Sequence, residues 1–170
     1  MGLLSTTKFD TLEDLFLHEL EDIYDAEQRL VKALPSLAGA SNSARLRAAF
    51  EAHTLETEGH VSRLDQVFAA INKKPSRTTC DAMKGLLAEG DTIAGAKGSE
   101  EVRDAALILA AQKIEHYEIA SYGTLRTFAQ TLGLTQIATL LQETLNEEEG
   151  CDRLLTELAL SVVNPKAETV

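Results

Sequence analysis

The sequence contains few of the residues that build β-sandwiches or disulfide frameworks. Aromatic residues make up 5% of the chain, tryptophan is absent, and there are only 3 prolines and 2 cysteines. This composition favours helices over a β-sandwich. Cys80 and Cys151 form no C-x-x-C pair, so the sequence does not support a thiolate metal site or a disulfide framework. Two reduced cysteines predict a cytoplasmic protein.

Basic residues and long apolar runs are also scarce. The chain has 27 acidic residues against 16 lysines and arginines, which gives a net charge of −11. Such an acidic surface repels phosphate backbones, so we expect no nucleic-acid partner. The longest apolar run, residues 105–111, is too short to cross a bilayer, and residues 1–10 lack the apolar core of a signal peptide. We therefore expect no membrane partner.

Helical periodicity dominates what the chain does contain. We expect residues 1–170 to form a single all-α domain, because this length suits one hydrophobic core. Asp10 and Glu13 have the spacing of a capping box, and Gly133 is a helix-ending residue. Together with the apolar periodicity, these signals predict four long helices over residues 10–38, 43–72, 99–132 and 135–163.

The connections between these helices predict the topology. Short turns join the first two helices and the last two helices into antiparallel hairpins. Residues 73–98 form a much longer connection, with a short helix predicted at residues 80–89. Such a connection can cross the full length of a four-helix bundle, which is the ferritin-like arrangement. The alternative is an up-and-down bundle with a loose insertion, but a long connection in a compact domain usually has a purpose.

Acids and histidines lie on the apolar stripes that should face inward. Glu27 sits between Ile23 and Leu30, and two histidines interrupt the stripe of the second helix. An isolated ionised carboxylate is very costly in an apolar interior, and no lysine or arginine lies on these stripes. A shared cation between the four helices would remove that cost. The candidate metal ligands are Glu27, His53, Glu56, Glu115, Glu118, Glu143 and Glu147.

The spacing of these residues supports a common site but leaves one choice open. His53-x-x-Glu56 places both side chains on one helical face, and Glu56-x-x-x-His60 does so as well. Whether His60 or His116 also ligates therefore stays open. Carboxylates with one or two imidazoles and no thiolate suit iron, with manganese or zinc as alternatives. We expect two such ions at mid-height of the bundle.

A distinctive stretch lies in the third predicted helix, where residues 115–125 read EHYEIASYGTL. Shorter stretches of the same kind are YDAE at 24–27, AALI at 105–108 and QETL at 142–145. Together they resemble the YciF/YciE-like family of bacterial stress proteins over about residues 11–167. The resemblance implies a fold like that of rubrerythrins and ferritins, a homodimer, and a di-iron or similar centre. At the position of Asn146 the family often has an acid. Asparagine is a weaker metal ligand than a carboxylate.

Two classes of function fit these observations. The first is a metal-dependent protein that reacts with oxygen or peroxide, or that handles iron. The second is a stress-induced structural or interaction protein whose acids are vestigial or bind a non-redox ion. The sequence does not establish turnover. Self-association is also expected, because leucines lie outside the inward stripes at Leu12, Leu15, Leu55 and Leu107.

Overall fold

Four long helices run side by side in the computed structural model, which describes residues 7–75 and 78–170. These helices are α1 (Leu12–Ala40), α2 (Ala44–Ala70), α4 (Glu100–Thr131) and α5 (Thr135–Leu158). A shorter helix, α3 (Asp81–Ala94), lies between α2 and α4 in the chain. A π-helical segment, Ala159–Val163, and α6 (Asn164–Ala167) extend α5. The all-α class is confirmed; residues 1–6 and 76–77 of the predicted 1–170 domain lie outside the described residues.

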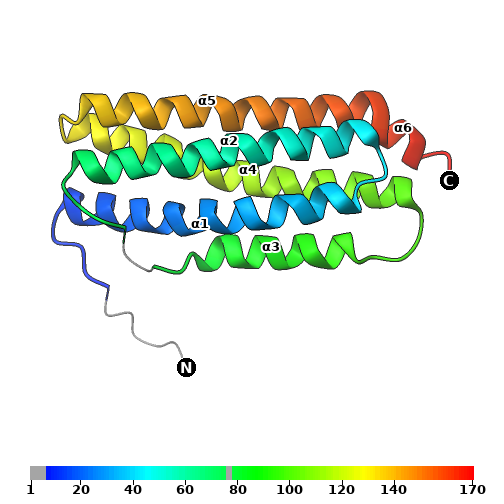
Figure 1. The fold of residues 1–170 in the computed structure, drawn as a ribbon, viewed down its shortest axis with the longest axis horizontal. Coiled ribbons are helices and arrows are strands. Elements are labelled where there is room, and N and C mark those ends of the chain that lie inside the picture. The colour runs from blue at the N-terminus through cyan, green and yellow to red at the C-terminus, as the bar shows by residue number, and fades with distance from the viewer. Residues whose placement is uncertain (1–6, 76–77) are drawn as a thin grey trace.

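The long connection crosses the bundle as predicted. In Figure 1, α3 carries the chain back along the bundle, so α4 starts at the end where α2 starts and runs parallel to it. α1 packs against α2 and α4, α5 packs against α2 and α4, and α3 lies outside against α1 and α4. The ferritin-like crossover is therefore confirmed, and the up-and-down alternative does not apply.

Several helix boundaries differ from the predicted ones by local capping. The capping box of α1 consists of Thr11 and Asp14, one residue later than predicted, because the Thr11 hydroxyl accepts from the Asp14 amide. α1 also continues past Gly39 to Ala40, since its last turn still buries Leu37. α3 extends to Ala94, five residues beyond the predicted end.

One glycine lies in a helix contact and another ends a helix. Gly90 of α3 is buried, and a methyl group there would make an ordinary van der Waals contact, 3.7 Å from Cδ2 of Leu37, so α3 packs on α1 without requiring glycine. Gly133 adopts a φ of 74° directly after α4, where a left-handed residue ends the helix as predicted.

A buried acid ties α4 to the turn between α1 and α2. The carboxylate of Asp104 accepts hydrogen bonds from the backbone amides of Asn42 and Ser43, at 2.8 and 2.7 Å. These amides lie at the start of α2, whose dipole favours a negative charge there. Asp104 therefore has its partners within the protein and requires no cation.

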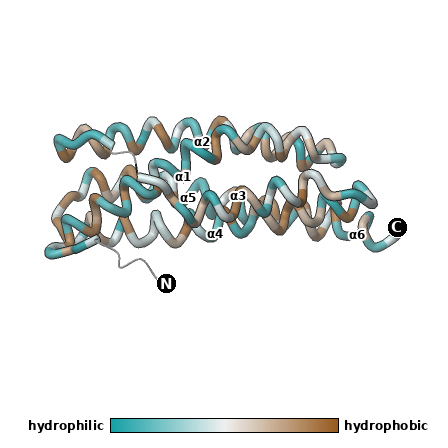
Figure 2. Tube along the Cα trace, turned by 90° about the horizontal axis from the view of Figure 1, so that it is seen from below, coloured by the Kyte–Doolittle hydropathy of each residue, from teal (hydrophilic) through white to brown (hydrophobic). Residues whose placement is uncertain are grey.

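Apolar side chains from all four long helices form one continuous core. Hydrophobic and hydrophilic positions alternate along each helix in Figure 2, as expected for helices with one buried face. Leu107 is fully buried in this core, which corrects the expectation that it faces outward. Among the described residues, no helix is both long and apolar enough to span a membrane.

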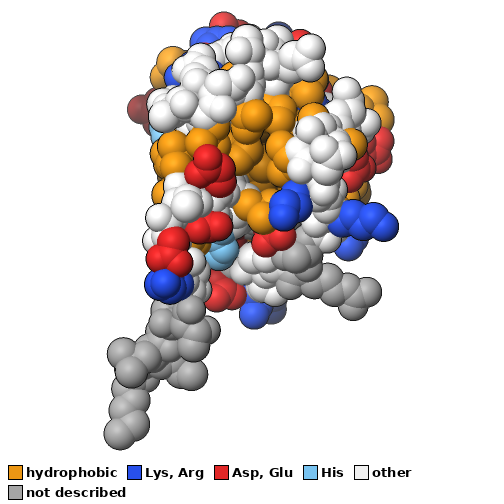
Figure 3. All heavy atoms as spheres, turned by 90° about the vertical axis from the view of Figure 1, so that its left-hand side faces the viewer, with side chains coloured by type: hydrophobic (Ala, Val, Ile, Leu, Met, Phe, Trp, Pro, Cys, Tyr) orange, Lys and Arg blue, Asp and Glu red, His pale blue; other side chains and the backbone are white. Residues whose placement is uncertain are grey.

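One end of the bundle carries an apolar hollow. Figure 3 views this end and shows hydrophobic side chains at its centre with acidic and basic side chains around them. The hollow has a volume of about 290 Å³ and lies where α1 begins and α4 gives way to α5. Its apolar lining comes from Phe16, Leu17, Ile71, Leu132 and Leu134.

Candidate metal centre

Six buried polar side chains meet at mid-height between the four long helices. We call them the inner cluster, and each is at most 2% exposed. Its members are Glu27 of α1, His53 and His60 of α2, Glu115 and Glu118 of α4, and Glu148 of α5. Every long helix therefore contributes at least one potential ligand.

Helical spacing explains why these side chains point inward together. His53 and His60 are seven residues apart, which places them on one face of α2 with Phe50 on the same stripe. Glu115 and Glu118 are three residues apart on the buried face of α4. The apolar residues of each stripe draw the polar ones inward as the helices pack.

Short distances link the imidazoles to the carboxylates. The Nδ1 atom of His60 lies 2.9 Å from Glu148 Oε1 and 3.4 Å from Glu27 Oε1. The Nε2 atom of His53 lies 3.3 Å from Glu115 Oε1 and 3.8 Å from Glu148 Oε2. Glu148 thus faces both histidines and lies between two groups of ligands.

Most polar atoms of the inner cluster lack a hydrogen bond. Within the described part of the chain, six carboxylate oxygens and two ring nitrogens of the cluster are buried without a hydrogen-bond partner of suitable geometry. Buried polar atoms are normally satisfied, so this concentration of unsatisfied ones needs an explanation. Oxygen and imidazole ligands aimed at one point fit a bound cation of the iron, manganese or zinc type.

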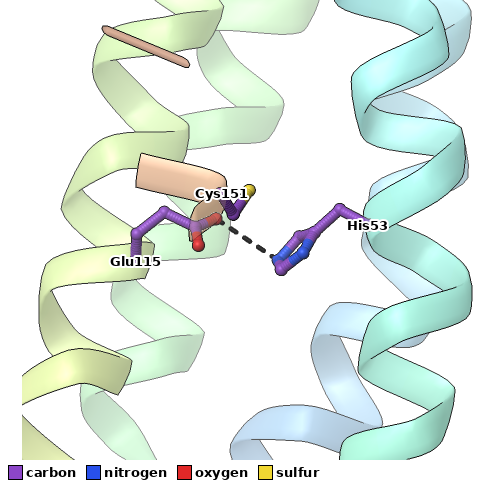
Figure 4. A group of neighbouring side chains, drawn as sticks. All are labelled: His53, Glu115 and Cys151. Carbon is purple, nitrogen blue, oxygen red and sulfur yellow. Dashed lines mark ion pairs between the residues drawn. The ribbon is translucent and has the colours of Figure 1, made fainter. Parts of the chain in front are cut away.

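Among the described residues, the potential ligands form two overlapping groups. The first consists of Glu27, His60 and Glu148, and the second contains His53 and Glu115. Within each group, the potential ligand atoms lie within 4.8 Å of one another. The second group is completed either by Glu118 with Glu148 or by Cys151. Figure 4 shows that the side chains of His53, Glu115 and Cys151 converge from α2, α4 and α5.

Burial and mutual repulsion perturb the pKa values in the cluster. Burial is the main reason that the pKa values of Glu27, Glu115 and Glu118 are raised, and that of Glu115 reaches about 8. Burial by itself lowers the pKa values of His53 and His60, but the carboxylates facing them outweigh it and raise the values to about 9 and about 10. Without a cation, the protonated imidazoles partly neutralise the carboxylates.

The Cys151 thiol responds to the same surroundings. Burial raises its pKa, and the nearby carboxylates of Glu115 and Glu148 raise it further.

Tyr122, which is fully buried, donates a hydrogen bond to Oε1 of Glu27. This bond fixes Oε1, which lies 3.4 Å from Nδ1 of His60, while the other oxygen, Oε2, is buried without a hydrogen-bond partner among the described residues.

Three of the predicted ligands lie at the rim, outside the inner cluster. We call them the outer carboxylates, and they are Glu56, Glu143 and Glu147. Glu56 contacts Nδ1 of His53 at 3.3 Å, and Glu147 contacts Nε2 of His60 at 2.9 Å. Glu143 contacts only Arg63 among the described ion pairs.

Arg63 changes the charge balance at this rim. The inward stripes predicted from the sequence contained no basic residue. In the structure, Nη1 of Arg63 in α2 lies 2.9 Å from Oε2 of Glu147, and its Nε lies 3.4 Å from Oε2 of Glu143. Its Nη1 also donates to the Thr144 hydroxyl at 2.6 Å. Glu143 and Glu147 therefore have a basic partner that the sequence analysis did not anticipate.

The structure brings together Glu27, His53, Glu115 and Glu118, as the sequence predicted. It adds His60, which the sequence left open, and Glu148, which the sequence missed. Glu148 stands next to the predicted Glu147, so a stripe rotated by one residue would have found it.

Two other residues considered from the sequence lie away from the cluster. His116 is 69% exposed and pairs with Asp152 at 3.3 Å. Asn146 is exposed and accepts a hydrogen bond from Gln142 at 2.7 Å. Its amide therefore faces the surface of α5 and leaves the inner cluster unaffected.

Comparisons with known proteins agree with this architecture. A family model described as a domain of unknown function, DUF892, matches residues 11–168. Protein YciF of Escherichia coli (strain K12) is 52% identical over 159 residues, which cover 93% of this chain and 96% of YciF.

Two solved structures show the same fold at high identity. The crystal structure of the E. coli stress protein YciF has a TM-score of 0.89 and 50% identity, covering 92% of this chain and 99% of that one. YcfI from Rhodopseudomonas palustris, suggested to be a structural protein, has a TM-score of 0.86 and 42% identity, covering 90% and 98%. The resemblance inferred from the sequence motifs is confirmed: the chain belongs to the DUF892 family and is a relative of the stress protein YciF.

Proposed function

We propose that this protein is a stress-associated, ferritin-like protein that binds two metal ions between its four long helices. The observation that carries the proposal is the convergence of four buried carboxylates and two imidazoles, of which six oxygens and two ring nitrogens have no hydrogen-bond partner of suitable geometry among the described residues. Four ionised carboxylates carry four negative charges, which two divalent cations would balance. The association with stress rests on the likeness to the E. coli stress protein YciF.

The two overlapping groups suggest how the ions would be shared. Glu27 and His60 would hold one ion, and His53 and Glu115 the other. Glu148 belongs to both groups and would help to hold both ions, with Glu118 as a further carboxylate of the second group. Carboxylates from facing helices that combine with imidazoles are the usual ligand set of di-iron and di-manganese bundles.

Iron is the ion that we propose first, with manganese and zinc as alternatives, because the cluster offers mainly oxygen and nitrogen ligands. When bound, two iron ions supply electrons for reaction with oxygen or peroxide, or are simply stored. The surrounding core of leucine, isoleucine and phenylalanine residues excludes water from the site. Tyr122 fixes the Glu27 carboxylate through its hydrogen bond.

Two of the outer carboxylates, Glu56 and Glu147, orient the two histidines. Glu147 faces Nε2 of His60 and so leaves Nδ1 to point at Glu27 and Glu148. Glu56 faces Nδ1 of His53 and leaves Nε2 to point at Glu115. A carboxylate behind a ligating imidazole selects its tautomer and raises its basicity. In this proposal Glu56 and Glu147 position ligands from the rim.

Metal analysis tests this function directly. We expect the full chain, purified without chelators and loaded with Fe²⁺, to bind about two ions per chain, as other two-metal bundles do. Glu27→Gln should lose bound iron, whereas the matched control Glu143→Gln, an exposed rim carboxylate, should keep it. Consumption of peroxide by the loaded wild type but not by Glu27→Gln would support redox turnover. Equal iron content in both variants would overturn the proposal.

A structural or interaction role is the second candidate. Two observations favour it: the imidazoles can partly neutralise the cluster without any metal, and the similar protein YcfI is suggested to be structural. In that case, metal-treated and metal-free protein should melt at the same temperature. A rise in melting temperature with Fe²⁺, Mn²⁺ or Zn²⁺ would reject vestigial acids, and peroxide consumption by the iron-loaded protein would reject the second function altogether.

We also propose that the protein is a cytoplasmic homodimer. Both cysteines are free thiols, which agrees with a reducing compartment. Several large apolar side chains are exposed on three helices and could meet a second copy: Leu55, Val102, Leu109 and Leu154. Sedimentation at micromolar concentration should show twice the 18.4 kDa chain mass. A single monomeric species would reject the dimer.

A further inference from the structure

Cys151 lies at the edge of the inner cluster and has no role in the function proposed above. Its side chain is 8% exposed, and its sulfur lies within 4.8 Å of ligand atoms of both His53 and Glu115. Figure 4 shows the Glu115 carboxylate turned toward the imidazole of His53, with the Cys151 side chain beside that carboxylate. Cys80, the other cysteine, is in none of the groups that could hold a metal ion.

The position of Cys151 along α5 supports a ligand role. Glu148 and Cys151 are three residues apart, so both project from one face of the helix. In two-metal carboxylate bundles, a Glu-x-x-His pair supplies a carboxylate and an imidazole with this spacing. Here α5 presents a thiol where that pattern places an imidazole. The second histidine of the cluster, His60, comes from α2 and serves the other group.

Neighbouring atoms indicate that the space beside this thiol suits a cation. Nε2 of His53 and Oε2 of Glu115 are buried and lack hydrogen-bond partners among the residues that the structure describes. Both side chains are at most 3% exposed, so neither atom can turn to bulk water. Together with the sulfur they offer three different donor atoms for one position.

We propose that Cys151 is a thiolate ligand of the ion held by His53 and Glu115, which makes the two metal positions chemically unequal. The position of Glu27 and His60 has oxygen and nitrogen ligands only, whereas the position of His53 gains sulfur. A bound cation deprotonates a coordinating thiol outright, so the metal–sulfur bond replaces the S–H bond and one proton passes to solvent. Thiolate ligands favour softer ions, so this position prefers Zn²⁺ or Co²⁺ over Mn²⁺.

This inference rests on the proposed two-metal function and adds one specific ligand to it. The sequence alone offered no support for a thiolate site, because it contains no pair of nearby cysteines. The structure supports a mixed site because it places one cysteine from α5 beside ligands from α2 and α4.

Cobalt spectroscopy on the full chain tests the inference. Co²⁺ bound to a thiolate gives a sulfur-to-metal charge-transfer band in the near ultraviolet, in addition to its visible ligand-field bands. We expect this band in the wild type and in the matched control Cys80→Ser, and its loss in Cys151→Ser. Removing a residue that only orients a metal ligand costs roughly 10–100-fold in metal affinity. Loss of the thiolate, a direct ligand, should therefore weaken one of the two Co²⁺ sites by at least about tenfold.

X-ray absorption on zinc-loaded wild type supplies a measurement that does not depend on a variant's folding. A Zn–S distance of about 2.3 Å, separate from Zn–N and Zn–O distances of about 2.0–2.2 Å, should appear. Bound zinc without sulfur scattering, or cobalt bands without charge transfer, would overturn the thiolate ligand and leave the two-metal function standing. Loss of the charge-transfer band in Cys80→Ser instead of Cys151→Ser would also overturn it. Failure to bind any metal would reject the proposed function itself.

Discussion

Acids are buried at two places in this bundle, and their surroundings differ. At the turn between α1 and α2, both oxygens of Asp104 accept backbone hydrogen bonds, at 2.8 and 2.7 Å. At mid-height, six carboxylate oxygens of the inner cluster have no such partner within the described chain. Burial alone therefore does not distinguish a structural acid from a metal ligand. The distinguishing feature is whether the protein itself satisfies the buried oxygen.

This comparison leads to opposite expectations for the two places. Asp104 should stabilise the fold whether or not metal is present, because its partners belong to the chain. The inner cluster should stabilise the fold only with a cation, because its repelling carboxylates otherwise raise the free energy of the folded state. The following predictions test this difference, from the largest expected effect to the smallest.

The largest effect should come from Glu148, which belongs to both ligand groups. Removing a residue that only orients a metal ligand costs roughly 10–100-fold in metal affinity. Glu148 is proposed to bind the metal directly, so Glu148→Ala should weaken binding of Fe²⁺ by more than about 100-fold. Both ions should be affected, because the carboxylate faces both histidines. Isothermal titration under anaerobic conditions measures this change.

The neighbouring Glu149 provides the matched control for that experiment. It is exposed, and among the described ion pairs its partner is Arg153. Glu149→Ala should therefore bind Fe²⁺ as the wild type does. Equal weakening by the two substitutions would mean that general negative charge attracts the metal, and the distinction between satisfied and unsatisfied acids would fail.

Removing Asp104 should destabilise the protein with or without metal. A hydrogen bond to a charged group contributes about 1.5–3 kcal/mol, and Asp104→Ala removes two such bonds to part-buried amides, which water replaces only in part. We expect the free energy of unfolding, measured with urea, to fall by about 2 kcal/mol or more. Metal affinity should stay unchanged.

Glu118→Gln should show the reverse pattern. Among the described residues neither oxygen of Glu118 has a hydrogen-bond partner, so an uncharged side chain of the same size removes repulsion without removing a bond. The metal-free variant should be at least as stable as the wild type, while the gain in stability on adding Fe²⁺ should shrink. A metal-free Glu118→Gln protein that is clearly less stable would place Glu118 in the same class as Asp104.

Metal-free protein should lose stability as the pH rises from about 5 to 9. The folded-state pKa of Glu115 is raised from its usual value of 4.5 to about 8, and those of His53 and His60 from 6.5 to about 9 and about 10. A raised pKa means that the folded state holds its proton more tightly than the unfolded state does. Its stabilising contribution is therefore complete at low pH and disappears as the pH passes through the folded-state value.

Metal should oppose this trend, because cations compete with protons for the same ligands. Melting temperatures measured across this pH range, with a chelator and with Zn²⁺, should diverge as the pH rises. Parallel curves would show that the cluster titrates without binding a cation. The divergence should be smaller in Glu115→Gln, since that side chain no longer exchanges a proton for a metal.

The outer carboxylates should have the smallest effects. Glu147→Gln removes the carboxylate behind His60, and Glu56→Gln removes the one behind His53. Each should weaken Fe²⁺ binding by roughly tenfold, the lower end of the range for groups that orient a ligand. Glu143→Gln, which loses only its contact with Arg63, should leave affinity unchanged. A loss for Glu147→Gln as large as that for Glu148→Ala would indicate that Glu147 ligates directly.

The helices and much of the cluster could be predicted from periodicity. In α1, Glu27 is flanked by Ile23 and Leu30 on one buried stripe. Turning the helix about its own axis buries both Ile23 and Leu30 in only one orientation, and that orientation also buries Glu27. In α5, leucines occur in adjacent pairs, Leu140–Leu141 and Leu154–Leu155. Two stripes one residue apart therefore each carry leucines, and these pairs alone do not say which stripe is buried.

Packing selects the second of these stripes. Leu141 and Leu155 are each 1% exposed, whereas Leu154 is 42% exposed. Successive residues of a helix are turned by about 100°, so this choice moves Glu147 to the rim and Glu148 to the centre. The stripe of α5 predicted from the sequence was wrong by one residue for this reason.

The sequence by itself determined the all-α class, the two hairpins, the crossover and the presence of acids and histidines at mid-height. These features follow from local capping, helical periodicity and the lengths of connections, all of which act between residues close in the chain. Only the tertiary structure determined that Asp104 caps α2, that Arg63 reaches Glu147, and that Cys151 faces His53. Each of these contacts joins two helices, and it depends on how the helices rotate as their apolar faces pack, which no single helix encodes.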